Sequence, residues 1–183
     1  KSGKDHAVDV KDMRLARIVQ RCLDLPGEEL FQYVDEDGAL RVVESADVNE
    51  YIKGIARGDF TAKDFRTWAG TVLTASSLVA PFASVAEGKR NIVAAIRSVS
   101  LRLGNTVAVC RKCYVHPHVV ESYLEGELVT ALAAQSHGSR SSGAGLSSVE
   151  AAVLAHLRDY AARKAKGGSG RKSRGPLRVR AAA

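Results

Sequence analysis

Apolar residues recur every three to four positions along most of this chain, a spacing that predicts a mainly α-helical protein. Val48, Tyr51, Ile52 and Ile55, for example, would line one face of a helix that Ser45 caps. The same spacing, together with capping and helix-breaking residues, predicts helices over residues 11–22, 45–55, 61–79, 86–103, 117–124 and 128–134, and a last helix that starts after Ser147.

β-structure is expected only in the N-terminal part. Two short β-prone runs, residues 31–34 and 39–43, flank a DEDG turn and predict a β-hairpin. Residues 1–10 begin with a glycine-containing turn and then mix apolar and polar side chains, as one arm of a hairpin would. The expected fold class is therefore mainly α (α+β), with a small β element near the N-terminus.

The helix expected over 61–79 has a distinctive composition. Thr61 and Asp64 approximate a capping box, and Arg66 lies at the edge of the apolar stripe. Gly70, one turn beyond Arg66, leaves that flank open to a main chain or a phosphate. A guanidinium there could bind two phosphate oxygens, or it could simply pair with Asp64 or another acid. The stripe expected to be buried comprises Phe65, Trp68, Ala69, Val72 and Leu73.

Length and charge set the domain organisation. The 183 residues, 45% of them hydrophobic, suffice for one domain with its own core, which we place at residues 1–166. A Ser/Gly-rich stretch at 135–146 predicts a flexible linker within it, and residues 167–183 predict a basic disordered tail. The net charge of +7 favours a polyanionic partner, but the tail supplies five of the positive charges and no acid. Because the chain starts at Lys1 rather than Met, we expect a fragment of a longer protein.

Cysteine usage indicates a reducing compartment, since three cysteines do not make a disulfide scaffold. Cys110 and Cys113 have a CxxC spacing that could bind zinc or form a redox pair. Zinc would need two more ligands, and only His116 and His118 are near in sequence, so no metal site is expected. Two small side chains that pack near Tyr114 are the favoured interpretation. No apolar run approaches the roughly 20 residues of a membrane span.

The stretch LGNTVAVCRKCYVHP, residues 103–117, carries the clearest chemical signal. Gly104 is expected to end a helix in the left-handed conformation. Asn105 can cap a short new helix with apolar residues Val107, Ala108 and Val109.

That short helix brings Tyr114 next to Arg111 and Lys112. A phenol has an unperturbed pKa of about 10, so it becomes a usable nucleophile only where positive charge or a base favours the phenolate. The same cations would hold a phosphodiester. His116, two residues further on, is an alternative base for this tyrosine.

This stretch resembles the nucleophile region of type IB DNA topoisomerases, specifically the short bacterial enzymes related to the poxvirus topoisomerase. A second run, TAKDFRTW at 61–68, resembles the KD(F/L)RT(W/Y) motif of that family. The two runs stand in the family's order, and the resemblance covers about residues 1–165. It implies a helical catalytic domain of the topoisomerase and tyrosine-recombinase kind.

The resemblance also implies roles. Tyr114 would be the nucleophile that forms a 3′-phosphotyrosyl link, while Arg66 and Asn105 would stabilise charge on the phosphate. Lys1 aligns best with the family's general acid, and Lys4 is second. The activity implied is supercoil relaxation through a transient single-strand break.

Partners and surroundings are implied in the same way. Lys63, Arg111 and Lys112 would contact double-stranded DNA. No metal, nucleotide or other cofactor is expected, and we expect a monomer in the bacterial cytoplasm, at the nucleoid.

Two positions depart from the family's usual pattern. Asn105 stands where poxvirus and cellular members have histidine, and it could serve as a phosphate donor, as a helix cap or as both. Val107 replaces a usual proline. A further arginine that the family uses, upstream of the lysine, is not in this chain, so we expect the 183 residues alone to cleave poorly.

Two alternative functions remain open at this point. A tyrosine recombinase uses the same phosphotyrosyl chemistry but carries an HxxR box before the tyrosine; here the only such letters, His137 to Arg140, follow it. A non-catalytic basic DNA-binding module is the other alternative.

Overall fold

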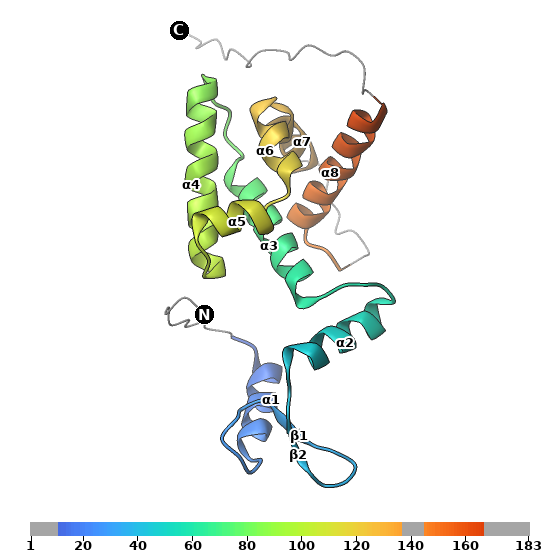
Figure 1. Ribbon diagram of the computed structural model, residues 1–183. Helices are drawn as coiled ribbons and strands as arrows, with labels where there is room; N and C mark the ends of the chain where they lie inside the picture. The colour runs from blue at the N-terminus through green and yellow to red at the C-terminus, as the bar shows by residue number, and fades with distance from the viewer. Residues whose placement is uncertain (1–10, 137–144, 167–183) are drawn as a thin grey trace. The chain divides into compact units, whose positions relative to one another are not determined.

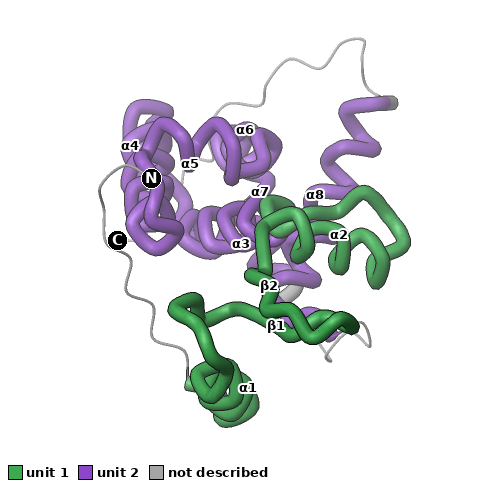
Figure 2. Tube along the Cα trace, turned by 60° about the horizontal axis from the view of Figure 1, so that its bottom comes forward, with its two compact units in different colours: residues 1–64 green, residues 65–183 purple. Residues whose placement is uncertain are grey.

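The structure is a computed structural model that describes residues 11–136 and 145–166. Lys1, Lys4, the expected hairpin arm at 1–10, most of the expected linker and the basic tail lie outside the described residues. The chain divides between Asp64 and Phe65 into two compact units, coloured separately in Figure 2, and each is described by itself.

The described part of the first unit, from residue 11 on, contains helices α1 and α2 and the expected hairpin. Helix α1 spans Met13–Leu23, and α2 spans Ser45–Ala56. Strands β1 (Gln32–Val34) and β2 (Leu40–Val42) pair antiparallel, with Tyr33 opposite Arg41. The Asp35 carboxylate holds the turn, since it accepts hydrogen bonds from the Asp37 and Ala39 N–H groups. The mainly helical class with a small N-terminal β element is thereby confirmed.

The cap of α2 differs from the expectation. Ser45 is the first helical residue, and Glu44 is the N-cap, whose N–H donates to the Asp47 carboxylate over 2.7 Å. The predicted Ser45 cap is therefore wrong by one residue, because the Glu44–Asp47 pair supplies the reciprocal bond at the right spacing.

Six further helices follow within the described residues, and Figure 1 shows them in green to red. They are α3 (Ala62–Ser77), α4 (Val85–Leu103), α5 (Val107–Cys113), α6 (Pro117–Leu124), α7 (Glu127–Ser136) and α8 (Ser148–Lys166). The capping box expected for the first of these is present, since Asp64 accepts from Thr61, and the last helix begins after Ser147 as expected, with Glu150 accepting from Ser147 in the same way.

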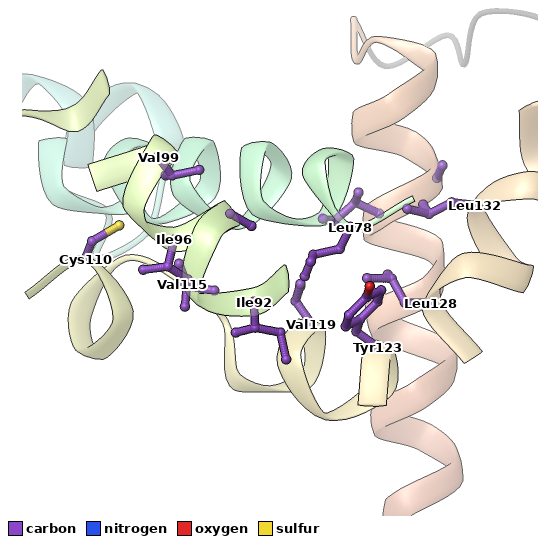
Figure 3. Close-up of a cluster of buried hydrophobic side chains, with 14 of the residues drawn as sticks. Leu78, Ile92, Ile96, Val99, Cys110, Val115, Val119, Tyr123, Leu128 and Leu132 are labelled. Atoms are coloured by element: carbon purple, nitrogen blue, oxygen red, sulfur yellow. The ribbon is translucent and has the colours of Figure 1, made fainter. Parts of the chain in front are cut away.

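The core of the second unit draws on α3, α4, α6, α7 and α8 and on the residues around α5. Figure 3 shows how side chains from these segments converge, with Ile92 and Ile96 of α4 near Val115 and Val119, and Tyr123 near Leu128. Cys110, Val119 and Leu128 are fully buried. Burial of such side chains stabilises the fold by about 1.5–3 kcal/mol each, so this cluster fixes the path of the chain on both sides of Tyr114.

The buried face of α3 follows the predicted apolar stripe only in part. Phe65 is 63% exposed, whereas Gly70, Thr71, Thr74 and Ala75 are buried. Trp68, Val72 and Leu73 of the predicted stripe are partly buried and pack against the core. The stripe prediction is wrong at Phe65 because small residues allow α3 to approach a neighbouring main chain closely, and a hydrophobic pattern does not register that contact.

No single helix in the described part of the chain is long and apolar enough to cross a membrane; α4 and α5 together would be, but a 96° bend separates them.

Candidate active site

Tyr114 lies at the C-cap of α5, where its N–H donates to the Cys110 carbonyl oxygen over 2.9 Å. The nearest buried residues before and after it in the sequence are Cys110, which is fully buried, and Val115, which is 6% exposed. The Tyr114 side chain itself is half-buried. Its backbone is therefore held by the core while its ring remains partly accessible.

Arg66 lies beside this ring. Its guanidinium carbon is 5.2 Å from the centroid of the Tyr114 ring, although 48 residues separate the two in sequence. The Arg66 side chain is exposed, and such a contact over an aromatic face is worth about 0.5–1 kcal/mol at an exposed site. The structure thus brings together the two residues that the sequence motifs singled out.

The Leu103 carbonyl oxygen accepts hydrogen bonds from two side chains next to this ring. Arg66 Nη2 donates to the Leu103 carbonyl oxygen, and the Asn105 amide Nδ2 donates to the same oxygen over 3.1 Å. Gly104 ends α4 in the left-handed conformation (φ 66°, ψ 34°), as expected, and thereby turns the chain after Leu103. A guanidinium and an amide that converge on one oxygen form a donor pair suited to an oxygen of a phosphate group.

Among the residues that the structure describes, no salt bridge joins Arg66 to Asp64 or to another acid. The Asp64 carboxylate accepts from the N–H and the hydroxyl of Thr61, both over 2.8 Å. These hydrogen bonds hold the pKa of Asp64 below its ordinary value. Asp64 therefore serves the helix start, and the guanidinium two residues later is directed elsewhere.

Asn105 does not cap α5. The N-cap is Thr106, whose hydroxyl accepts from the Val109 N–H over 3.3 Å. The capping part of the prediction for Asn105 is wrong, because Thr106 stands three residues before Val109, the spacing that a hydroxyl cap requires. The Asn105 amide is consequently available for the contact with Leu103.

Helix α3 contacts the main chain on both sides of Tyr114. The Thr67 hydroxyl donates to the Cys113 carbonyl oxygen over 3.3 Å, and the buried Thr71 hydroxyl accepts from the His116 N–H over 3.1 Å. Between them, Gly70 faces the Tyr114 carbonyl so closely that an added Cβ would overlap its oxygen and lie 3.1 Å from its carbon. Sequence reasoning noted that Gly70 leaves this flank open, but it did not assign Thr67 or Thr71.

The three predicted DNA-contacting cations are all at the surface. Lys63 is exposed in the first turn of α3, and Arg111 and Lys112 are exposed in the last turn of α5, just before Tyr114. Lys1 and Lys4, the candidates for the general acid, lie outside the described residues.

The cysteine pair next to the tyrosine has a structural place. Cys110 is fully buried and Cys113 half-buried, and both are free thiols. Burial raises the pKa of the Cys110 thiol, although the positive charge of Arg66 opposes this. A buried thiol of raised pKa is a poor nucleophile, which favours packing over redox chemistry. Among the described residues, no group of three or more His, Cys, Asp or Glu side chains could hold a metal ion.

His116, the alternative base considered for Tyr114, caps the next helix. It is the N-cap of α6, and its Nδ1 accepts from the His118 N–H over 3.2 Å. Burial and the neighbouring His118 lower the pKa of His116. Its ring contacts that of His118, with 4.8 Å between centroids.

A phenol, a guanidinium and an amide gathered in this way are groups chemically suited to nucleophilic attack on a phosphate ester. Residues 2–136 match the family model described as the catalytic core of eukaryotic DNA topoisomerase I. The chain therefore belongs to this topoisomerase I family.

A curated relative agrees with this family. The DNA topoisomerase 1B of Acanthamoeba polyphaga mimivirus is 32% identical to the chain over 114 residues, which cover 57% of the chain and 34% of the viral protein. The chain thus spans about a third of the length of this relative.

Proposed function

We propose that this chain provides the catalytic domain of a type IB DNA topoisomerase, an isomerase that relaxes supercoiled double-stranded DNA. Membership of the topoisomerase I family and the similarity to a viral topoisomerase 1B support the proposal. The observation that carries it is the convergence of Arg66 and Asn105 on one oxygen, with the Arg66 guanidinium 5.2 Å from the Tyr114 ring.

In the proposed reaction the Tyr114 phenol gives up its proton to solvent as its oxygen attacks a DNA phosphorus, and the bond from phosphorus to the 5′-oxygen breaks. The phosphate stays on the enzyme as a 3′-phosphotyrosyl ester, and the 5′-oxygen leaves as a hydroxyl after it receives a proton. The free strand can then rotate, and attack of the 5′-hydroxyl on the ester reverses both bond changes. Since one ester replaces another, no external energy source is required.

Arg66 and Asn105 would donate hydrogen bonds to the non-bridging oxygens, where negative charge grows in the transition state. Removal of one such donor from an enzyme site typically costs 10²–10³ in rate. Lys1, with Lys4 as the second candidate, would give the proton to the leaving oxygen. Lys63, Arg111 and Lys112 would bind flanking phosphates.

The narrower assignment is to the short bacterial enzymes related to the poxvirus topoisomerase, acting as a monomer in the cytoplasm at the nucleoid. Its support is the run from Gly104 to Pro117, with asparagine at 105. A form extended upstream of Lys1 is expected to cleave faster than the 183 residues alone, since the family uses a further arginine that this chain does not contain.

The test is covalent capture of DNA by the parent and by Tyr114→Phe, in the 183-residue chain and in an extended form. The parent should give a denaturant-stable protein–DNA adduct, and Tyr114→Phe should give none while it binds duplex DNA with similar affinity. A binding module would show no adduct from any form. Supercoiled circles, with and without a second duplex, then separate relaxation from strand exchange by a recombinase.

A further inference from the structure

We propose that Gly70 and Thr71 of α3 are positioning residues for the Tyr114 nucleophile, because they fix the main chain that carries it. The inference rests on the proposed function. It concerns two residues that have no assigned part in catalysis and that contact the backbone of the tyrosine segment rather than its ring.

First, hydrogen bonds from α3 hold the main chain on both sides of Tyr114. Thr67 binds the carbonyl of the residue before it, and Thr71 binds the N–H of His116, two residues after it. Both threonines lie on one face of α3, four residues apart and so about one helical turn. The main chain of Tyr114 is thus held at both ends by the same helix.

The second observation is the close approach between those two bonds. A Cβ added at Gly70 would overlap the Tyr114 carbonyl oxygen and would also lie 3.1 Å from the Tyr114 Cβ. These are backbone and Cβ atoms, which cannot rotate away as the end of a long side chain could. Any larger residue at position 70 must therefore displace the nucleophile's own main chain from α3.

The third observation links this face to the phosphate-binding group. Arg66 stands one turn before Gly70 on the same helix, and its guanidinium lies over the Tyr114 ring. One rigid helix therefore holds both a donor for the phosphate and the backbone of the group that attacks it. Reaction rates are sensitive to such placement, since a misplacement of about 1 Å can cost about 10²-fold.

The main test compares Gly70→Ala with Gly54→Ala, a matched control. Gly54 also lies within a helix, α2, but a Cβ there would meet nothing within 4 Å. Gly70→Ala should slow single-turnover DNA capture by about 10- to 100-fold, with little change in DNA affinity. Gly54→Ala should capture DNA at the parental rate.

A second pair of variants tests the hydrogen bond between the His116 N–H and the Thr71 hydroxyl. Thr71→Val keeps the shape of the side chain but offers no acceptor to the His116 N–H, whereas Thr71→Ser keeps the hydroxyl. We expect Thr71→Val to slow capture by about 10-fold and Thr71→Ser to restore most of that loss. Because this change is isosteric, it remains informative if Gly70→Ala does not fold.

A substrate with sulfur in place of the 5′-bridging oxygen separates placement from proton transfer. Sulfur is a good leaving group that needs no proton, so it should relieve defects in acid catalysis only. The slow capture by Gly70→Ala and Thr71→Val should persist on this substrate. Recovery to the parental rate would overturn the positioning role.

All variants are made in whichever protein, the 183-residue chain or its extended form, captures DNA through Tyr114 before substitution. If no form captures DNA, the proposed function fails. If the parent captures DNA and both Gly70→Ala and Thr71→Val match it at temperatures well below unfolding, the function stands and this inference is wrong.

Discussion

Asn105 and Thr106 are neighbours whose side chains could each have capped α5, but they make different hydrogen bonds. Thr106 satisfies the Val109 N–H, while the Asn105 amide joins Arg66 at the Leu103 carbonyl oxygen. A neutral amide donates at any physiological pH, so this position can serve a phosphate without titrating.

Substitution of Thr106 should therefore lower stability, whereas substitution of Asn105 should slow DNA capture. Thr106→Ala should lower the free energy of unfolding by about 1 kcal/mol through loss of the cap, with DNA capture nearly intact below the unfolding temperature. Asn105→Ala should leave stability nearly unchanged and slow capture by about 10²-fold through loss of a donor. Urea denaturation and single-turnover capture of both variants test this, and equal effects of the two on stability would contradict the assignment.

Among the elements, α6 and α8 are joined by a largely buried polar network. His156 of α8 is 3% exposed, and its Nε2 lies 2.9 Å from the Ser122 hydroxyl, which itself donates to the His118 carbonyl oxygen. The Tyr160 hydroxyl donates to Glu125, and burial raises the pKa of Tyr160 to about 12. These bonds connect α8 to the helix that begins three residues after Tyr114.

This network should weaken in mild acid. Burial first, and then the positive charge of Arg163, lower the pKa of His156 from its ordinary value of 6.5. His156 therefore takes up a proton near pH 6.5 in the unfolded chain but only at lower pH in the folded protein. The free energy of unfolding consequently decreases as pH falls from 6.5 toward the pKa of His156 in the folded protein. Stability at pH 5.5 should be below that at pH 7.5.

His156→Gln keeps a polar group for Ser122 but does not titrate. Its stability should depend less steeply on pH between 7.5 and 5.5, with a residual slope from His116, whose pKa is also lowered. Urea denaturation at both pH values measures the difference. An unchanged slope in the variant would exclude His156 as a contributor.

Sequence patterns anticipated the described helices and the hairpin because each depends on local rules, such as helical spacing or a capping pair like Ser147 with Glu150. They failed at Phe65, since the buried face of α3 is set by small residues that contact a main chain. The approach of Arg66 to Tyr114 depends on tertiary packing and could be expected only through the family resemblance. The shared acceptor at Leu103 is a backbone atom, so no side-chain pattern could reveal it.

For the molecule as a whole, the described apolar core belongs to the second unit. Every residue of that core cluster lies between Ala75 and Val153, whereas Gln32 is the only described residue of the first unit that is buried. The hydrophobic stabilisation of the second unit therefore comes from its own helices.

Residues 60–166 should accordingly fold without the preceding part. This range keeps the Thr61–Asp64 cap of α3 and all of the core cluster. We expect a cooperative thermal transition and protected amides in α4 and α6 by hydrogen exchange. A broad transition with exposed apolar surface, detected by dye binding, would show that the core needs residues 11–59.

The Leu103 carbonyl has a consequence for how this protein can be dissected by mutation. Every amino acid supplies the same carbonyl, so an alanine scan would leave the shared acceptor in place and attribute any effect at position 103 to lost packing of the side chain. An ester in place of the 103–104 amide weakens that oxygen as an acceptor and also removes the Gly104 N–H, which donates to the Leu101 carbonyl oxygen, so it would disclose what the whole peptide group contributes.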